Sequence, residues 1–209
     1  MHNSNRIGTH GKISNLVIGV DSEQFVVWVE NGGVVGRGVL LDYKGWAESQ
    51  GLKPAVLDTT EITVQELDAI AAAQGVTFQP GDILFVHSGF VKALEALEGD
   101  DAKNYAANPP PKAIGVKSGE ETMKWIWEKQ FAAVAGDMLA FEALPFQSNT
   151  HWLHEWLLAG WGMPIGELFD LEKLATECRR LNKWSFFFSS VPLKVPGGVA
   201  SPPNGVAIL

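Results

Sequence analysis

The alternation of short apolar runs with longer helical segments constrains the fold of this chain most. Four runs are rich in β-branched or aromatic residues and indicate buried strands, at 34–41, 83–86, 131–137 and 184–191. Segments with helical character lie between and beyond them, at 63–74, 120–130, 151–160 and 170–181. Strands that alternate with helices are typical of an α/β architecture. The sequence shows no internal repeat and no linker, so we expect one domain.

Local signals refine this outline. Thr63 and Glu66 fit a capping box at a helix start, and Gly75 is expected to end that helix. Two further short strands are expected at 16–20 and 25–29. The composition of 100–115 is loop-like, and 196–204 forms a tail rich in glycine and proline.

Composition excludes several classes of function. The formal net charge of −8 disfavours binding to nucleic acid, and the sequence has no basic stripe that could offset it. The single cysteine, Cys178, excludes an internal disulfide and a thiolate zinc cluster, and suits a reducing compartment. The sequence contains neither an apolar run of about 18 residues nor a secretory signal. We therefore expect a cytoplasmic protein without a membrane partner.

One histidine and one glutamate are the leading candidates for chemistry. His154 lies in the segment 151–160, and Glu167 follows about one helix and one turn later. Imidazole and carboxylate groups are suitable ligands for zinc or manganese. Such an ion would lower the pKa of a bound water and polarise a carbonyl, as amide hydrolysis requires. The alternative is a surface histidine and a glutamate at a helix end.

Other residues are weaker candidates. His151 could share a helix face with His154, or it could face solvent at the helix start. His87 follows a strand and could line a pocket, although ordinary packing at a strand end is the alternative. We interpret Asp137 as a structural turn residue and Cys178 as an ordinary helix residue. The Gly-Thr-His sequence at 8–10 is treated as a coincidence, because Gly11 and Lys12 follow where a metal motif needs an acid.

Several sequence blocks occur together in a consistent order. They are 38–43 with 46–48, 62–67 with 81–84, 131–137, 154–171 and 197–204. In combination they resemble the cyclase family of kynurenine formamidase-like and isatin hydrolase-like proteins, in particular a branch common in fungi. The resemblance covers roughly residues 28–209.

The resemblance implies a fold, an activity and roles for particular residues. The fold would be a swivelling β/β/α-type α/β domain, which is often a homodimer. The activity would be hydrolysis of a small aryl amide such as N-formylkynurenine, with zinc or manganese as the ion and aromatic side chains holding the ring. By position, His154 resembles the late metal-binding histidine and Glu167 resembles the glutamate that bridges the metals. Asp137 matches a family turn aspartate.

The chain also departs from the family pattern. The main ligand motif, His-x-Gly-Thr-His-x-Asp-x-Pro-x-His or its Asp-Gly-x-x-His version, would lie upstream of residues 3–6. We therefore expect a cyclase-like domain at 28–209 that lacks its N-terminal strands, preceded by an atypical segment at 1–27 that is a candidate insertion. A catalytic zinc normally keeps three protein ligands, and only two candidates remain. The alternatives are an inactive family member that acts as a scaffold or binding module, and a ligand-binding α/β module without metal.

Overall fold

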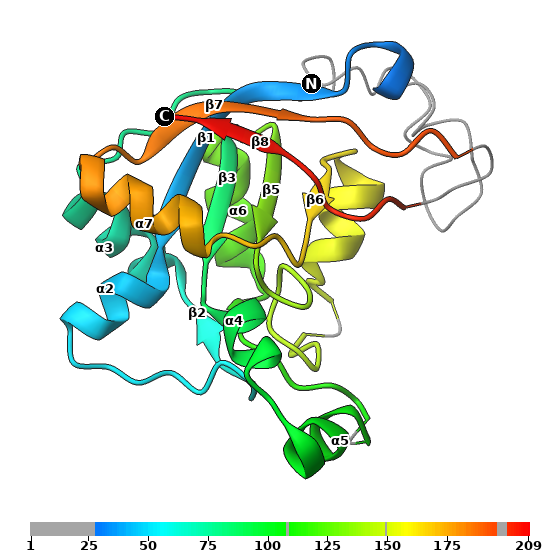
Figure 1. Cartoon of the computed structure of the whole chain (residues 1–209). Coiled ribbons are helices and arrows are strands. Elements are labelled where there is room, and N and C mark those ends of the chain that lie inside the picture. Colours follow the sequence, from blue (N-terminus) through cyan, green and yellow to red (C-terminus); the bar gives the residue numbers. More distant parts are fainter. Residues whose placement is uncertain (1–27, 108, 149, 196–199) are drawn as a thin grey trace.

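A six-stranded sheet forms the centre of the computed structural model, which describes residues 28–107, 109–148, 150–195 and 200–209 (Figure 1). The strand order is β6-β5-β3-β1-β7-β8. β1, β3, β5 and β6 run parallel, and β7 pairs antiparallel with both β1 and β8. The strands are β1 (Val34–Asp42), β3 (Ile83–His87), β5 (Ala133–Gly136), β6 (Ile165–Gly166), β7 (Ser185–Ser190) and β8 (Val206–Ile208).

β3 and β5 are buried along their whole length, and β1 is buried from Gly38 to Asp42, because both faces of the sheet are covered there. Successive side chains of a strand point to opposite faces of the sheet, so each strand contributes to two separate cores. In β3, for example, Leu84 and Val86 pack on one side while Ile83 and Phe85 pack on the other. The same division holds for β1 and β5.

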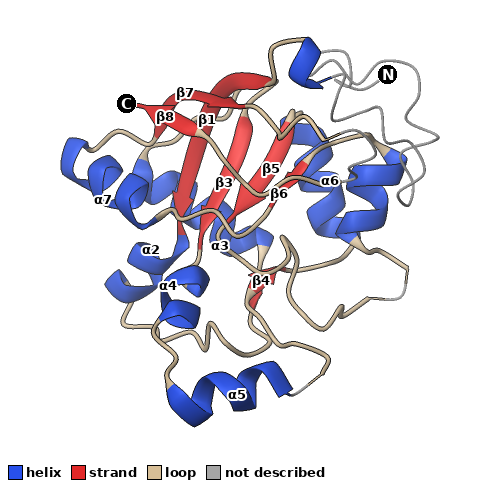
Figure 2. Cartoon of the chain, turned by 45° about the vertical axis from the view of Figure 1, so that its right-hand side comes forward, coloured by secondary structure: helices blue, strands red, loops and turns tan. Residues whose placement is uncertain are grey.

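Helices cover the two faces unequally (Figure 2). One core is built largely against α2, α3, α6 and the π-helical segment η3, whereas α7 supplies the helical part of the other. The remaining helices are α4 and α5, and α5 projects away from the sheet at the bottom of Figure 1. The bounds are α2 (Tyr43–Ser49), α3 (Val64–Gln74), α4 (Phe90–Glu95), α5 (Gly99–Ala107), α6 (Glu120–Lys129), η3 (Glu155–Gly160) and α7 (Glu172–Leu181).

A second, two-stranded sheet lies beside this framework. It pairs β2 (Glu61–Ile62) in parallel with β4 (Gly115–Val116). An isolated bridge links Val116 of β4 to Glu142, so this small sheet holds the segment that follows β5. That segment carries a side chain of the candidate active site.

Most of the expected elements are confirmed. The structure has the α/β architecture, and the four predicted strands correspond to β1, β3, β5 and β7. The predicted helices at 63–74, 120–130 and 170–181 correspond to α3, α6 and α7. The capping box is present, since Glu66 Oε2 accepts from Thr63 N at 2.8 Å and Thr63 Oγ1 accepts from Glu66 N at 3.3 Å. Gly75 ends α3 in a left-handed conformation with φ of 64°.

Other expectations are wrong in part. The segment 100–115 is not a loop throughout, because α5 occupies 99–107 with no buried residue, which leaves no apolar pattern to reveal it. Residues 28–30 are helical, so the strand expected at 25–29 does not extend into the described region. The helix expected at 151–160 begins at Leu153 and continues as η3. The strand expected at 16–20 and the motif at 8–10 lie outside the described residues.

Among the residues that the structure describes, no helix combines the length and apolar character needed to cross a membrane.

Candidate active site

The two residues predicted to bind metal lie together. His154 immediately precedes η3, and Glu167 immediately follows β6. His154 Nε2 is 2.9 Å from Glu167 Oε1, and the two side chains are 27% and 33% exposed. Glu167 Oε1 also accepts from the backbone nitrogen of Phe141 at 3.1 Å, which fixes the carboxylate. The pair is therefore held in place and still accessible from solvent.

A third acidic residue, Glu142, holds the other side of the imidazole. Its carboxylate is fully buried and lies 2.8 Å from His154 Nδ1. The backbone nitrogens of Leu153 and His154 donate to it, each at 2.9 Å, and the Ser118 hydroxyl donates a short hydrogen bond. Because every donor converges on one buried carboxylate, Glu142 fixes both the backbone and the ring of His154.

Close backbone packing positions Glu142. Val116 N donates to Phe141 O at 2.8 Å, and Ala143 N donates to Val116 O at 3.0 Å. A Cβ atom on Gly115 would overlap the backbone of Glu142 and Ala143, so only glycine permits this approach. β4 therefore packs directly against the backbone of the segment that carries the Glu142 carboxylate.

Mutual hydrogen bonding and charge shift the pKa values of His154 and Glu142 in opposite directions. Burial lowers the pKa of His154, but its hydrogen bonds to Glu142 and Glu167 and their negative charges outweigh this and raise the pKa to about 9. Burial raises the pKa of Glu142, yet hydrogen bonds from His154 and Ser118 and from the two backbone amides outweigh it and lower the pKa. Glu142 is therefore a carboxylate at neutral pH.

The geometry suits two ligands of one divalent ion. Zinc binds imidazole nitrogen and carboxylate oxygen at about 2.0–2.2 Å, so two such atoms 2.9 Å apart can share an ion. Glu142 lies at the opposite ring nitrogen, where a carboxylate orients a metal-binding histidine. Because Glu142 and Glu167 lie at opposite nitrogens of the imidazole ring, the two carboxylates cannot bind the same ion. Within the described part of the chain, no three His, Cys, Asp or Glu side chains are placed to hold a metal together.

Apolar side chains border the polar pair. Phe146 and Trp152 stack with ring centroids 4.9 Å apart, and the Phe146 ring lies 5.9 Å from the His154 ring. Leu168, directly after Glu167, is 40% exposed and has a φ of 56°. The site therefore combines a polar centre with an exposed apolar border.

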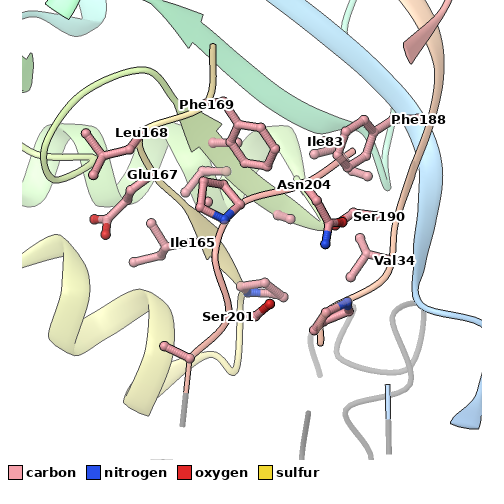
Figure 3. Close-up of a pocket in the computed structure, with 18 of the residues that line it drawn as sticks. Val34, Ile83, Ile165, Glu167, Leu168, Phe169, Phe188, Ser190, Ser201 and Asn204 are labelled. Atoms are coloured by element: carbon pink, nitrogen blue, oxygen red, sulfur yellow. The ribbon is translucent and has the colours of Figure 1, made fainter. Parts of the chain in front are cut away.

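A cavity of about 390 Å³ lies beside Glu167, on one face of the central sheet. Its floor is apolar and comes from β1, β3, β5 and β7, and Glu167 and Leu168 stand at one border (Figure 3). The C-terminal segment forms another wall, where Asn204 Nδ2 donates to Val191 O at 2.8 Å and so fastens the segment to the end of β7. His154 is not among the lining residues. The floor consists of Val34, Ile83, Phe85, Ala133, Ala135 and Phe188.

His87 belongs to a separate polar cluster and does not line this cavity. Its ring is fully buried, with Nδ1 2.7 Å from Asp42 Oδ1 and Nε2 3.3 Å from Glu172 Oε1. Lys44 pairs with Glu172 at 2.7 Å, and Arg179 pairs with Asp42 at 3.0 Å. The cluster ties α7 to the ends of β1 and β3, so the packing interpretation of His87 describes it better than the pocket interpretation.

The remaining candidate residues make contacts that indicate a structural role. Asp137 accepts from Ser88 N, Ser88 Oγ and Gly89 N at 2.7–2.8 Å, and so fixes the turn that begins α4. Cys178 is buried in α7. His151 precedes the first helical residue and pairs with the Thr150 hydroxyl at 2.8 Å, so the idea that it shares a helix face with His154 is wrong.

Sequence reasoning missed Glu142. The signal was present, because Glu142 is the one charged residue in the apolar stretch 138–146. A carboxylate among apolar neighbours predicts a buried group with specific partners. The spacing to His154 gave no further indication, since the contact is made by an irregular loop.

Comparisons with known proteins agree with this architecture. The family profile described as "Putative cyclase" matches residues 7–143. A crystal structure described as a novel cyclase is 32% identical, with a TM-score of 0.71, and the match covers 84% of this chain and 54% of that one. The chain thus spans about half the length of that relative. No curated protein matches the sequence.

Two more distant structures share the fold. Isatin hydrolase A from Labrenzia aggregata, bound to benzyl benzoate, is 19% identical with a TM-score of 0.62, and the match covers 97% of this chain and 70% of that one. Isatin hydrolase A from Ralstonia solanacearum is 17% identical with a TM-score of 0.63, at 97% and 69% coverage. The profile match spans more than half of the sequence, and the chain therefore belongs to the cyclase family.

Proposed function

We propose that the protein is a metal-dependent hydrolase of a small aryl amide such as N-formylkynurenine. The observation that carries the proposal is the contact of 2.9 Å between His154 Nε2 and Glu167 Oε1, with Nδ1 held by Glu142. His154 Nε2 and Glu167 Oε1 would be the ligands of a zinc or manganese ion. The chemistry supplied by such an ion is a lowered pKa of water and polarisation of the amide carbonyl.

The residues of the chain have distinct tasks in this scheme. Glu142 keeps the His154 ring in one orientation, so that Nε2 faces Glu167 and the open side of the site. Glu167, held by the amide of Phe141, offers a carboxylate that can take a proton from the attacking water and return it to the leaving amine. The balanced result is cleavage of the C–N bond, with a carboxylic acid and an amine as products.

Metal analysis and turnover test the proposal together. The purified protein is loaded with zinc or manganese, and hydrolysis of formanilide is followed. We expect a stoichiometric ion that His154→Ala and Glu167→Ala both lose, together with all turnover. His151→Ala is the matched control, because the ring of this nearby histidine pairs with the Thr150 hydroxyl at 2.8 Å and the variant should retain metal and activity. Wild-type turnover in both site variants would refute the assignment.

A non-catalytic role is the second candidate. One observation favours it: the described residues contain no group of three side chains that could bind one metal ion. A catalytic zinc normally has three protein ligands. In that case the chain would act as a scaffold or binding module. Absence of a bound ion and of turnover in the wild-type protein would support this alternative.

A further inference from the structure

Two exposed aromatic rings stand beside the polar pair of the candidate active site. Phe146 and Trp152 are 39% and 37% exposed, and their rings stack at 27° with centroids 4.9 Å apart. The Phe146 ring also lies 5.9 Å from the His154 ring. Aromatic surface next to a few polar groups suits a ligand with a flat apolar body and a polar head.

We propose that Phe146 and Trp152 bind the aryl ring of the substrate and thereby select aryl amides over aliphatic ones. This inference rests on the proposed function and assigns its specificity to two residues. A ring that stacks on the exposed Phe146–Trp152 surface carries its amide group toward His154 and Glu167, because Phe146 is in ring contact with His154. The two residues touch the substrate without taking part in proton transfer.

Leu168 adds exposed apolar surface next to Glu167. It follows Glu167 directly, is 40% exposed and adopts a left-handed backbone conformation with φ of 56°. A bulky residue such as leucine rarely adopts this left-handed conformation, and backbone strain of this kind is concentrated at functional sites. Exposed apolar side chains from two separate segments therefore lie close to the polar pair, Phe146 next to His154 and Leu168 next to Glu167.

The cavity on the sheet face is the competing place for the ring. It borders Glu167 but not His154, and the Glu167 carboxylate points away from the side where Val34 and Ser190 lie (Figure 3). A ring inside the cavity would therefore hold its amide away from the imidazole. The aromatic pair is the better placed surface, and the two locations predict different mutational effects.

Equilibrium binding of formanilide, measured by ligand-observed NMR in the presence of EDTA, tests the inference without turnover. We expect Phe146→Ala and Trp152→Ala each to weaken binding about two- to tenfold, the effect of losing one stacked ring. Trp152→Phe keeps a ring and should stay within about twofold of the wild type. N-butylformamide should bind more weakly than formanilide to the wild type and be unaffected by the substitutions.

Two controls locate the binding surface. Phe187→Ala removes a ring that is 50% exposed on β7, which is separated from β6 by three strands, and should leave binding unchanged. Phe169→Leu trims the wall of the cavity. The inference is overturned if Phe169→Leu weakens binding while Phe146→Ala and Trp152→Ala do not, or if the wild type shows no preference for formanilide.

The outcome is separable from that of the proposed function. Ring binding that depends on Phe146 and Trp152, without hydrolysis in the metal-loaded protein, would uphold this inference and refute the hydrolase. Hydrolysis that is insensitive to both substitutions would support the hydrolase and refute the role of Phe146 and Trp152.

Discussion

Glu142 Oε1 lies 2.9 Å from the backbone nitrogen and 2.8 Å from Nδ1 of the same residue, His154. One carboxylate oxygen therefore sets where the histidine enters its helix and how its ring is turned. Glu167 approaches the opposite ring nitrogen at 2.9 Å. The histidine is consequently held between two carboxylates, of which Glu142 is buried and Glu167 remains open to solvent.

Removing the Glu142 carboxylate should damage both stability and metal binding. Glu142→Ala leaves two backbone amides, the Ser118 hydroxyl and the imidazole without their buried acceptor, which should cost about 3–5 kcal/mol of unfolding free energy. Glu142→Gln retains one acceptor oxygen and should cost about half as much. Urea unfolding measures both, with Glu155→Ala, an exposed glutamate of η3, as control.

The same variants separate positioning from general stability. Zinc affinity, measured by calorimetric titration below the unfolding transition, should fall about 10- to 100-fold in Glu142→Gln, as for other residues that orient a metal-binding histidine. Equal zinc affinity in the wild type and Glu142→Gln would remove Glu142 from this role.

Gly115→Ala should disturb the site from a distance. The added methyl would overlap the backbone of Glu142 and Ala143, so we expect a loss of about 1–3 kcal/mol and a weaker affinity for zinc. Gly160→Ala is the matched control, because there the new Cβ would meet only a ring atom of Trp156 at 3.4 Å. Similar unfolding free energies for the two variants would contradict the close-approach argument.

Residues that follow a regular pattern could be predicted from the sequence, and those placed by irregular contacts could not. The strands β1, β3, β5 and β7 and the helices α3, α6 and α7 followed from apolar runs and helical segments, and the His154–Glu167 pair followed from family resemblance and ligand chemistry. The short strands β2, β4, β6 and β8 and the helices α2 and α4 were not predicted. Glu142 reaches His154 through a loop, and α5 buries no side chain, so neither left a periodic signal. The partners of His87 come from β1 and α7, a proximity that depends on tertiary packing.

The thiol of Cys178 should be unreactive in the folded protein. The side chain is fully buried, and burial, with a contribution from the charge of Asp42, raises its pKa to about 11. Since the thiolate is the reactive form, Ellman's reagent at pH 8 should label no cysteine in native protein and one per chain in guanidinium chloride. Rapid labelling of native protein would show that α7 detaches readily from the sheet.

The buried His87 should make stability depend on pH. Burial lowers the pKa of His87, but the hydrogen bond to Asp42 and the charges of Asp137, Asp42 and Glu172 outweigh it, so the folded pKa lies above the usual histidine pKa of 6.5. The folded state therefore binds the proton more tightly than the unfolded state does. This contribution is complete below about pH 6.5 and is lost as pH rises through the folded pKa, at no more than about 1.4 kcal/mol per pH unit.

A comparison with His87→Gln isolates that contribution. Glutamine does not titrate, so the difference in unfolding free energy between the wild type and His87→Gln should be largest near pH 6 and shrink toward pH 9. Lys44 pairs with Glu172 and Arg179 pairs with Asp42 in both proteins, so these ion pairs should cancel in the comparison. A difference that stays constant, or grows with pH, would mean that His87 is neutral in the folded protein.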